Sequence, residues 1–246
     1  MKTIEELEEE LFREWKKTDT GRFKDNFFHD GVPTPERYLQ TTIRTIFVLR
    51  EANFDGVRKD YHLRSELTTS PHPFWKGKIA PWCFGLADLD SSPNELWLQA
   101  MSIKNNTAQC IDLLNQFGYI QIKKAPGRAT SIPRELAEAA RLDGDLIRRQ
   151  LAIYQPTVIV ACGVSRPTTF DLLARHVFPG SLVRCRDQYK HRCAKVEDGH
   201  SERPPMFLIE TLHPSHRKSR EKVFKELIAD FRQVVNEFNL PQQIRE

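Results

Sequence analysis

The chain has 246 residues, of which 39% are hydrophobic, and a formal net charge of +4 at pH 7. This length suits one large α/β domain and is short for two, so we expect a single domain over residues 1–246. The longest apolar stretches, such as residues 157–162, are about six residues. Because roughly 20 apolar residues are needed to span a bilayer, the sequence predicts no transmembrane helix and no membrane partner.

The N-terminal segment is acidic and has helical periodicity, unlike a secretory signal peptide, which favours a cytoplasmic protein. The five cysteines are scattered and odd in number, so we expect reduced thiols rather than a disulfide framework. Acidic residues are concentrated at the start of the chain and basic residues in its last third. This distribution makes a polyanionic partner plausible, although a solvated surface is the ordinary explanation for a charge run.

The first half of the chain predicts mostly helix, with one strand. Residues 4–15 carry apolar side chains at helical spacing, which indicates an amphipathic helix. A short helix is expected after Pro33, to about Thr42, and a strand over Thr45–Arg50. Residues 55–95 hold Pro, His, Trp and Gly without a clear period, so we interpret them as a long irregular segment. A helical pattern returns over residues 94–117, with an interruption near Asn105.

The second half predicts strands that alternate with helices. The expected elements are strand 119–124, helical pieces 133–141 and 144–154, strand 157–162, helix 167–176, strand 206–211 and a long final helix. The strand 157–162 is apolar at every position, which is typical of a parallel sheet covered on both faces. The alternation predicts an α/β fold, namely a three-layer α/β/α sandwich around a central, mostly parallel four-stranded sheet.

Three of the four predicted strands end in loops rich in polar side chains. In a parallel sheet such loops meet at the edge where ligands bind. A general base and a charge-stabilising donor can be built from the carboxylate, amide, histidine and cations that they carry. The loops are residues 50–56 (REANFDG), 123–128 (KKAPGR) and 211–217 (TLHPSHR).

The order and spacing of these blocks resemble the uracil-DNA glycosylase superfamily over residues 45–231. YIQIKKAPGRATSIP, followed by LIRRQLAIYQPTVIVACG, is similar to the superfamily's middle block. FLIETLHPSHR is similar to its second signature motif, and FVLREANFDG is a looser copy of the first. The resemblance implies a monofunctional, monomeric DNA glycosylase without a cofactor. Such an enzyme hydrolyses the N-glycosidic bond of a flipped-out uracil or modified pyrimidine and leaves an abasic site.

The resemblance also implies catalytic roles for particular residues. Glu51 would orient the attacking water and support the positively charged sugar, with Asn53 as a further water-holding candidate. His213 would donate a hydrogen bond to a carbonyl oxygen of the departing base. The ordinary explanations are a surface carboxylate paired with Arg50 and a loop histidine beside a phosphate or a helix cap.

For base binding, Gln121 would read the pairing edge of the flipped base, and Phe54 would stack on its face. Phe74 and Phe84 are alternatives to Phe54, and for each of these aromatics core packing is the commoner role. DNA contacts are expected from the basic loops, by phosphate binding and by insertion into the minor groove. The expected phosphate-binding residues are Lys123, Lys124, Arg128 and Lys218, and the expected groove-binding residues are Ser215, His216 and Arg217.

The chain departs from the superfamily pattern in its first motif and its reading amide. The first motif lacks the small first residue and the proline of relatives, and Gln121 replaces an asparagine, which adds one methylene to the side chain. A modified pyrimidine, such as those of phage DNA, is therefore an open alternative to uracil, in a role of either repair or defence.

The metal centres of relatives are not expected here. The cysteine ligands of the iron–sulfur branch are missing, because Ala125 follows Lys124 and no paired cysteines precede the first strand. A second group could bind zinc by its ligand types, although a polar insertion without metal is the favoured interpretation. That group is Cys185, His191, Cys193 and His200.

Two alternatives to a glycosylase remain open at this stage. The first is a non-catalytic nucleic-acid binder on the same fold. The second is a nucleotide or small-molecule enzyme on a doubly wound sheet, which is disfavoured because no G-x-G-x-x-G or Walker loop is present. The sequence leaves the preference for single- or double-stranded DNA undecided.

Overall fold

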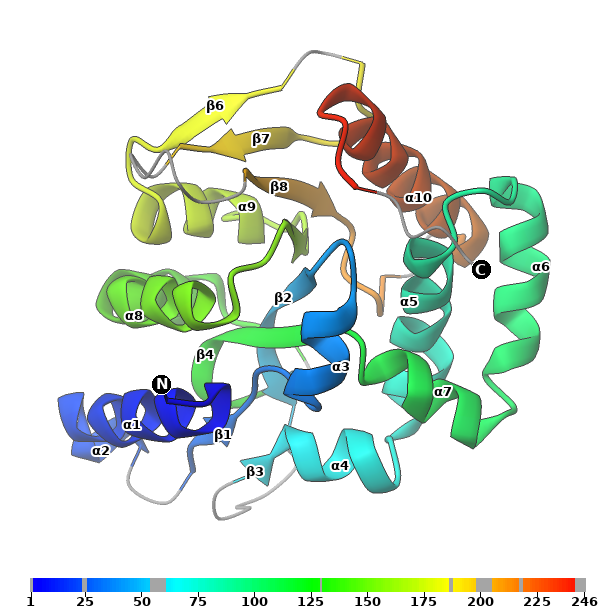
Figure 1. The fold of residues 1–246 in the computed structure, drawn as a ribbon. Helices are drawn as coiled ribbons and strands as arrows, with labels where there is room; N and C mark the ends of the chain where they lie inside the picture. Colours follow the sequence, from blue (N-terminus) through cyan, green and yellow to red (C-terminus); the bar gives the residue numbers. More distant parts are fainter. Residues whose placement is uncertain are drawn as a thin grey trace.

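The computed structural model describes residues 2–23, 26–53, 61–128, 130–185, 188–197, 205–216 and 219–241. Its strands are β1 (Phe28–His29), β2 (Thr45–Asn53), β3 (Tyr61–His62), β4 (Gly118–Gly127), β5 (Val158–Cys162), β6 (Leu182–Arg184), β7 (Cys193–Val196) and β8 (Met206–Thr211). Six of them form the main sheet, in the order β4-β2-β5-β8-β7-β6 (Figure 1). The chain is therefore a mixed α/β protein around a mostly parallel sheet.

The four strands predicted from the sequence are the parallel ones at β4, β2, β5 and β8. The prediction of a four-stranded sheet is nevertheless wrong, because β7 pairs antiparallel with β8 and β6 pairs antiparallel with β7. These two short strands carry no clear apolar alternation and are held by their hydrogen bonds to the sheet edge. β2 and β4 each continue three residues beyond their predicted ends, which places polar residues on strands rather than in loops.

Helices lie on either side of the sheet in Figure 1. They are α1 (Ile4–Thr18), α2 (Thr20–Phe23), α3 (Pro35–Gln40), α4 (Leu63–Thr69), α5 (Ala80–Ala87), α6 (Pro93–Ile103), α7 (Thr107–Leu114), α8 (Pro133–Tyr154), α9 (Thr169–Leu172) and α10 (Arg220–Glu237), with π-helical turns η1 (Trp75–Ile79) and η2 (Leu173–Val177). Within the described ranges, no helix is both long and apolar enough to cross a membrane.

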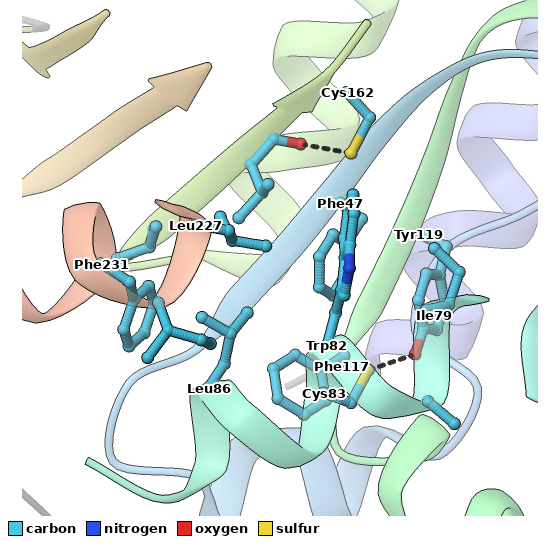
Figure 2. Close-up of a cluster of buried hydrophobic side chains, with 14 of the residues drawn as sticks. Phe47, Ile79, Trp82, Cys83, Leu86, Phe117, Tyr119, Cys162, Leu227 and Phe231 are labelled. Atoms are coloured by element: carbon cyan, nitrogen blue, oxygen red, sulfur yellow. Dashed lines mark hydrogen bonds between the residues drawn. The ribbon is translucent and has the colours of Figure 1, made fainter. Parts of the chain in front are cut away.

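Alternation along the strands divides the buried side chains into two clusters. Phe47 and Leu49 of β2 join a cluster with α5 and α10, whereas Ile46 and Val48 join one with α1 and α8. Successive strand side chains point to opposite faces, so the clusters lie on opposite sides of the sheet. Figure 2 shows the first cluster, where Phe47 packs near Trp82 with ring centroids 6.2 Å apart.

Two sequence interpretations of the helices are corrected by the structure. The segment expected to be irregular holds α4, η1, α5 and the start of α6. It shows no amphipathic period because helix α5 (APWCFGLA) is almost entirely buried and therefore apolar on all sides. The two helical pieces predicted around residue 142 form the single helix α8, since Gly144 continues the helix instead of ending it.

Candidate functional site

A cavity of about 730 Å³ lies at the carboxyl ends of the parallel strands. β2, the first strand of the main sheet, lies between β4 and β5, so the next strand of this sheet along the chain, β4, is added on one side of it and the following one, β5, on the other. Ligands bind at such reversals of strand order in open α/β sheets. The cavity is lined by Phe28, residues 49–52, Tyr61, Glu66, His72, Phe74, Trp75, Gln121, Arg128, Thr130, Ser131, residues 163–165, His213, Ser215 and His216.

Glu51 presents a buried carboxylate at the end of β2. Its side chain is 3% exposed, and Oε2 lies 3.1 Å from Nζ of Lys123, its register partner on β4. This ion pair lacks the alignment of a hydrogen bond, so Oε2 has no hydrogen-bond partner among the described residues. A side chain at Gly127 would collide with the Glu51 carboxylate. The glycine thus makes room for the carboxylate at the cavity wall.

Lys123 is shared between two carboxylates. Its Nζ donates to Oε2 of Glu135 at 2.6 Å and lies beside Glu51. Burial alone would lower the pKa of Lys123, but the two carboxylates raise it above its usual value. The ammonium is therefore held charged next to Glu51, and most of its side chain is covered.

Gln121 carries an amide oxygen that nothing in the described part of the chain satisfies. The residue is 4% exposed and lines the cavity. Its backbone N–H donates to Oδ2 of Asp30 at 2.6 Å, which anchors the strand, while Oε1 is buried without a hydrogen-bond partner. Buried polar groups are normally satisfied, so an unpaired acceptor in a cavity wall indicates a place for a ligand donor.

His213 is neutral and has a defined tautomer. Burial, then the nearby positive charge of Arg50, then His216 lower its pKa to about 4. Its Nδ1 accepts a hydrogen bond from the backbone N–H of Ser215 at 3.2 Å, so the proton is carried on Nε2. The ring lies nearly parallel to that of Phe74, with centroids 6.3 Å apart. The imidazole can therefore donate one hydrogen bond at neutral pH.

The aromatic wall of the cavity differs in part from the prediction. Phe74, an alternative in the sequence analysis, lines the cavity together with Trp75 and Tyr61. Phe84, predicted to bind a base, lies on α5 and packs against the hydrophobic core cluster instead. Phe54 falls outside the described residues, as does the side chain of Asn53.

The structure contradicts the prediction that Lys124 binds phosphate. β4 continues past residue 124, so this side chain points to the face covered by α1 and α8. It is 0% exposed, and its Nζ donates to Asp30 at 2.6 Å and to Gln150 at 2.9 Å. Arg128, Ser215 and His216 do lie at the cavity. Arg217 and Lys218 lie outside the described residues.

No known protein-family model matches this chain, and a search of curated proteins finds no related sequence. The site is therefore interpreted from its own geometry.

Several residues that line the cavity were not expected there from the sequence. Arg50 was noted only as a possible partner of Glu51, and Glu66, His72 and Trp75 fell in the segment taken as irregular. Arg50 could have been recognised from the sequence, because a cation in an otherwise apolar strand is unusual. No sequence signal placed the other three, since α4 and η1 bring them to the sheet edge by tertiary packing.

The four potential zinc ligands are only partly described. Cys185 and Cys193 have their Sγ atoms 3.3 Å apart, and Nδ1 of His191 lies 2.9 Å from the carboxylate of Asp230. His200 lies outside the described residues. Across the described ranges, no three metal-ligating side chains gather closely enough to hold an ion.

Proposed function

We propose that the chain is a monofunctional DNA glycosylase, built on a three-layer α/β/α sandwich, that hydrolyses the N-glycosidic bond of a flipped-out uracil or modified pyrimidine. One observation carries the proposal. Glu51, Gln121 and His213 line a single cavity and offer it a carboxylate, an unpaired amide oxygen and a neutral imidazole N–H. These groups match the needs of base recognition, sugar-cation stabilisation and departure of a base anion.

The cavity suits a flipped nucleotide. Its volume of about 730 Å³ falls within the usual range of small-molecule sites, roughly 300–1,000 Å³. Oε1 of Gln121 can accept a hydrogen bond from an N–H on the pairing edge of the base, and Phe74, Trp75 and Tyr61 offer aromatic surface for stacking. Flipped bases are held by this combination of edge hydrogen bonds and stacking.

The reaction follows from the placement of charge. As the bond between C1′ of the sugar and the base nitrogen breaks, its electron pair leaves with the base. The Glu51 carboxylate stabilises the positive charge on the sugar and orients a water, whose oxygen bonds to C1′ and whose proton is released. His213 donates from Nε2 to a carbonyl oxygen of the departing base, which spreads the negative charge.

An amine nucleophile is not required. Lys123 is held protonated by Glu51 and Glu135, and Lys124 is buried in an ion pair with Asp30. A protonated amine is a poor nucleophile, so we expect abasic sites to remain uncleaved until alkali is added.

The test is base release from labelled DNAs containing uracil, hypoxanthine, 5-hydroxymethyluracil or phage-type modified cytosines, with alkali to reveal abasic sites. At least one should be processed, and Glu51→Gln or His213→Asn should slow its release by about 10²- to 10⁴-fold. Glu135→Gln is the matched control. It removes the other carboxylate beside Lys123, outside the cavity, and should change the rate only a few-fold.

Wild-type protein that binds these DNAs and releases no base would favour a non-catalytic binder. If Glu51→Gln and Glu135→Gln reduced the rate of base release equally, the ion pairs of Lys123 would matter only for folding.

A further inference from the structure

Arg50 is a buried arginine in the wall of the cavity. It lies on β2 between Leu49, the register partner of Gln121, and Glu51. The residue is 8% exposed and lines the cavity. A permanent charge is costly to bury unless it is paired, so the donors of its guanidinium need partners.

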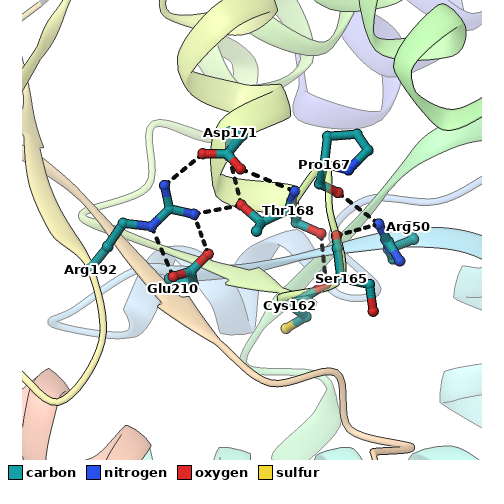
Figure 3. Close-up of polar contacts among 9 residues, drawn as sticks. Arg50, Cys162, Ser165, Pro167, Thr168, Asp171, Arg192 and Glu210 are labelled. Atoms are coloured by element: carbon teal, nitrogen blue, oxygen red, sulfur yellow. Dashed lines mark hydrogen bonds and ion pairs between the residues drawn. The ribbon is translucent and has the colours of Figure 1, made fainter. Parts of the chain in front are cut away.

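Within the described part of the chain, hydrogen bonds to the guanidinium are made at one nitrogen, Nη2. Nη2 donates to the backbone oxygens of Ser165 at 2.9 Å and Pro167 at 2.8 Å (Figure 3). Nε is buried without a hydrogen-bond partner among the described residues. Gly163, with φ of +123°, turns the backbone over this side chain, and a Cβ there would approach Cδ of Arg50 to 3.2 Å. The loop after β5 thus orients Arg50 while leaving part of its donor capacity unused.

Among the described residues, Glu51 supplies the negative charge that acts on Arg50. Burial lowers the pKa of Arg50, and the Glu51 carboxylate opposes this shift. Since the Glu51 carboxylate is already in contact with Lys123, Arg50 contributes net positive potential to its side of the cavity. The same potential helps to lower the pKa of His213, and both side chains line the same cavity.

We propose that Arg50 is a second catalytic residue, which acts beside His213 to stabilise the anion of the departing base. This inference rests on the proposed glycosylase function. As the bond from C1′ to the base nitrogen breaks, the electron pair moves into the ring and negative charge develops on its carbonyl oxygens. A largely buried guanidinium stabilises that charge more strongly than a neutral imidazole alone.

The depth of Arg50 favours the base over a phosphate as its ligand. Phosphates stay at the solvated surface of a DNA complex, where exposed cations meet them. Arg50 instead lies on the same strand as Glu51 and next to the pair formed by Leu49 and Gln121. The consequence for specificity is that this cavity suits pyrimidines that leave as poorly stabilised anions.

A leaving-group series tests this proposal. Single-turnover release is measured for 5-fluoro, unsubstituted and 5-methyl forms of the pyrimidine that the wild type releases. Arg50→Gln should lower the rate of release of the unsubstituted base by about 10²- to 10³-fold. The decrease should be at least tenfold smaller for the fluoro base and larger for the methyl base. Arg50→Lys, which keeps the charge, should recover part of the loss. It also supplies the comparison if Arg50→Gln fails to fold.

Arg192→Gln is the matched control. Arg192 donates to Thr168 and Asp171 at the start of α9, which follows the same loop, each at 2.6 Å (Figure 3), and is absent from the cavity lining. Its loss should leave the dependence of the rate on the leaving group unchanged.

Three outcomes overturn the inference, and they are distinguishable. An equal loss on all three bases would make Arg50 a structural support of the loop. Weaker DNA binding with a shallower salt dependence, at an unchanged leaving-group dependence, would make it a phosphate contact. Both leave the glycosylase function intact, whereas a wild type that releases no base at all removes the function and this inference together.

Discussion

His213 is held as a neutral hydrogen-bond donor, the form that its proposed role in base departure requires. A protonated imidazole would be the stronger donor, but burial and the charge of Arg50 exclude the proton. The hydrogen bond from the Ser215 backbone to Nδ1 then leaves the single proton on Nε2. The residue offers a fixed donor without a second full charge, and the positive charge is supplied by Arg50.

The titration of His213 is the first prediction at this scale. Its pKa, read from imidazole NMR signals and assigned with His213→Asn, should lie near 4. Arg50→Gln should raise it towards the ordinary value of about 6.5, since one lowering charge is removed. A wild-type value near 6.5 would contradict the geometry described here.

The lowered pKa of His213 also predicts the direction in which protein stability changes with pH. Because the pKa is lower in the folded state, the unfolded chain binds the proton first. His213 therefore contributes a loss of stability as pH falls from about 6.5 to about 4.

At the residue scale, Glu51 and His213 could be located because they follow predicted strands, whereas Gln121, inside a strand, was located only by the resemblance. All three line one cavity, because parallel strands bring their carboxyl ends to one edge. Lys124 was misplaced because the predicted strand ended at this residue, whereas β4 continues three residues further. Adjacent strand side chains point to opposite faces, so Lys123 lies beside Glu51 while Lys124 enters the opposite core.

At the scale of elements, Gly144 marks a close crossing of α8 and η2. A Cβ at this position would collide with the backbone carbonyl of His176, which is not free to rotate away. The sequence suggested a helix break at this glycine, because glycine is a weak helix former. The structure shows that it serves packing between two elements, which local sequence patterns do not reveal.

Gly144→Ala should therefore destabilise the protein by about 1–3 kcal/mol, as expected for overpacking of a close contact. Gly77→Ala in η1 is the matched control, since a Cβ there meets nothing within 4 Å. The control should range from no change to about 1 kcal/mol of stabilisation, because alanine favours helix. Denaturant unfolding of the two variants beside wild type measures both. Equal stability of all three would contradict the close crossing.

The helical elements between residues 63 and 87 were the least predictable part of the fold. α5 is buried nearly all round, so its eight residues lack the polar face that marks an amphipathic helix. α4 and η1 are one to two turns long and depend on tertiary contacts rather than on their own propensity. In contrast, β5 is an uninterrupted apolar run and α10 carries apolar residues at helical spacing, so both were located from the sequence.

At the scale of the whole molecule, a buried polar network ties the N-terminal helix to the sheet. Glu8 of α1 accepts a hydrogen bond from Tyr154 of α8 and forms an ion pair with Arg64 of α4. Asp30 and Lys124 continue the network to β4, directly behind Gln121. The network lies on the opposite side of the sheet from the α5–α10 cluster. Because Glu8 holds α1 to α8 and α4, the protonation of Glu8 is coupled to the stability of the fold.

This coupling predicts the pH dependence of global stability. Burial, opposed by Arg64, raises the pKa of Glu8 from 4.5 to about 7. Between these values the folded protein keeps a proton that the unfolded chain has lost, so the contribution of Glu8 to stability falls as pH rises. Over that window the loss is about 3 kcal/mol, at 1.36 kcal/mol for each pKa unit.

Glu8→Gln removes the titration and keeps an acceptor for Tyr154. The unfolding free energy of Glu8→Gln minus that of wild type should be near zero at pH 4.5 and should increase steadily towards pH 7.5. Urea unfolding at several pH values measures this difference. Glu14→Gln is the control on the same helix. Glu14 is exposed and paired with Arg149, which lowers its pKa, so its variant should lack this rise. A constant difference between Glu8→Gln and wild type would mean that Glu8 titrates as an ordinary carboxylate and that α1 is not coupled to the core by charge.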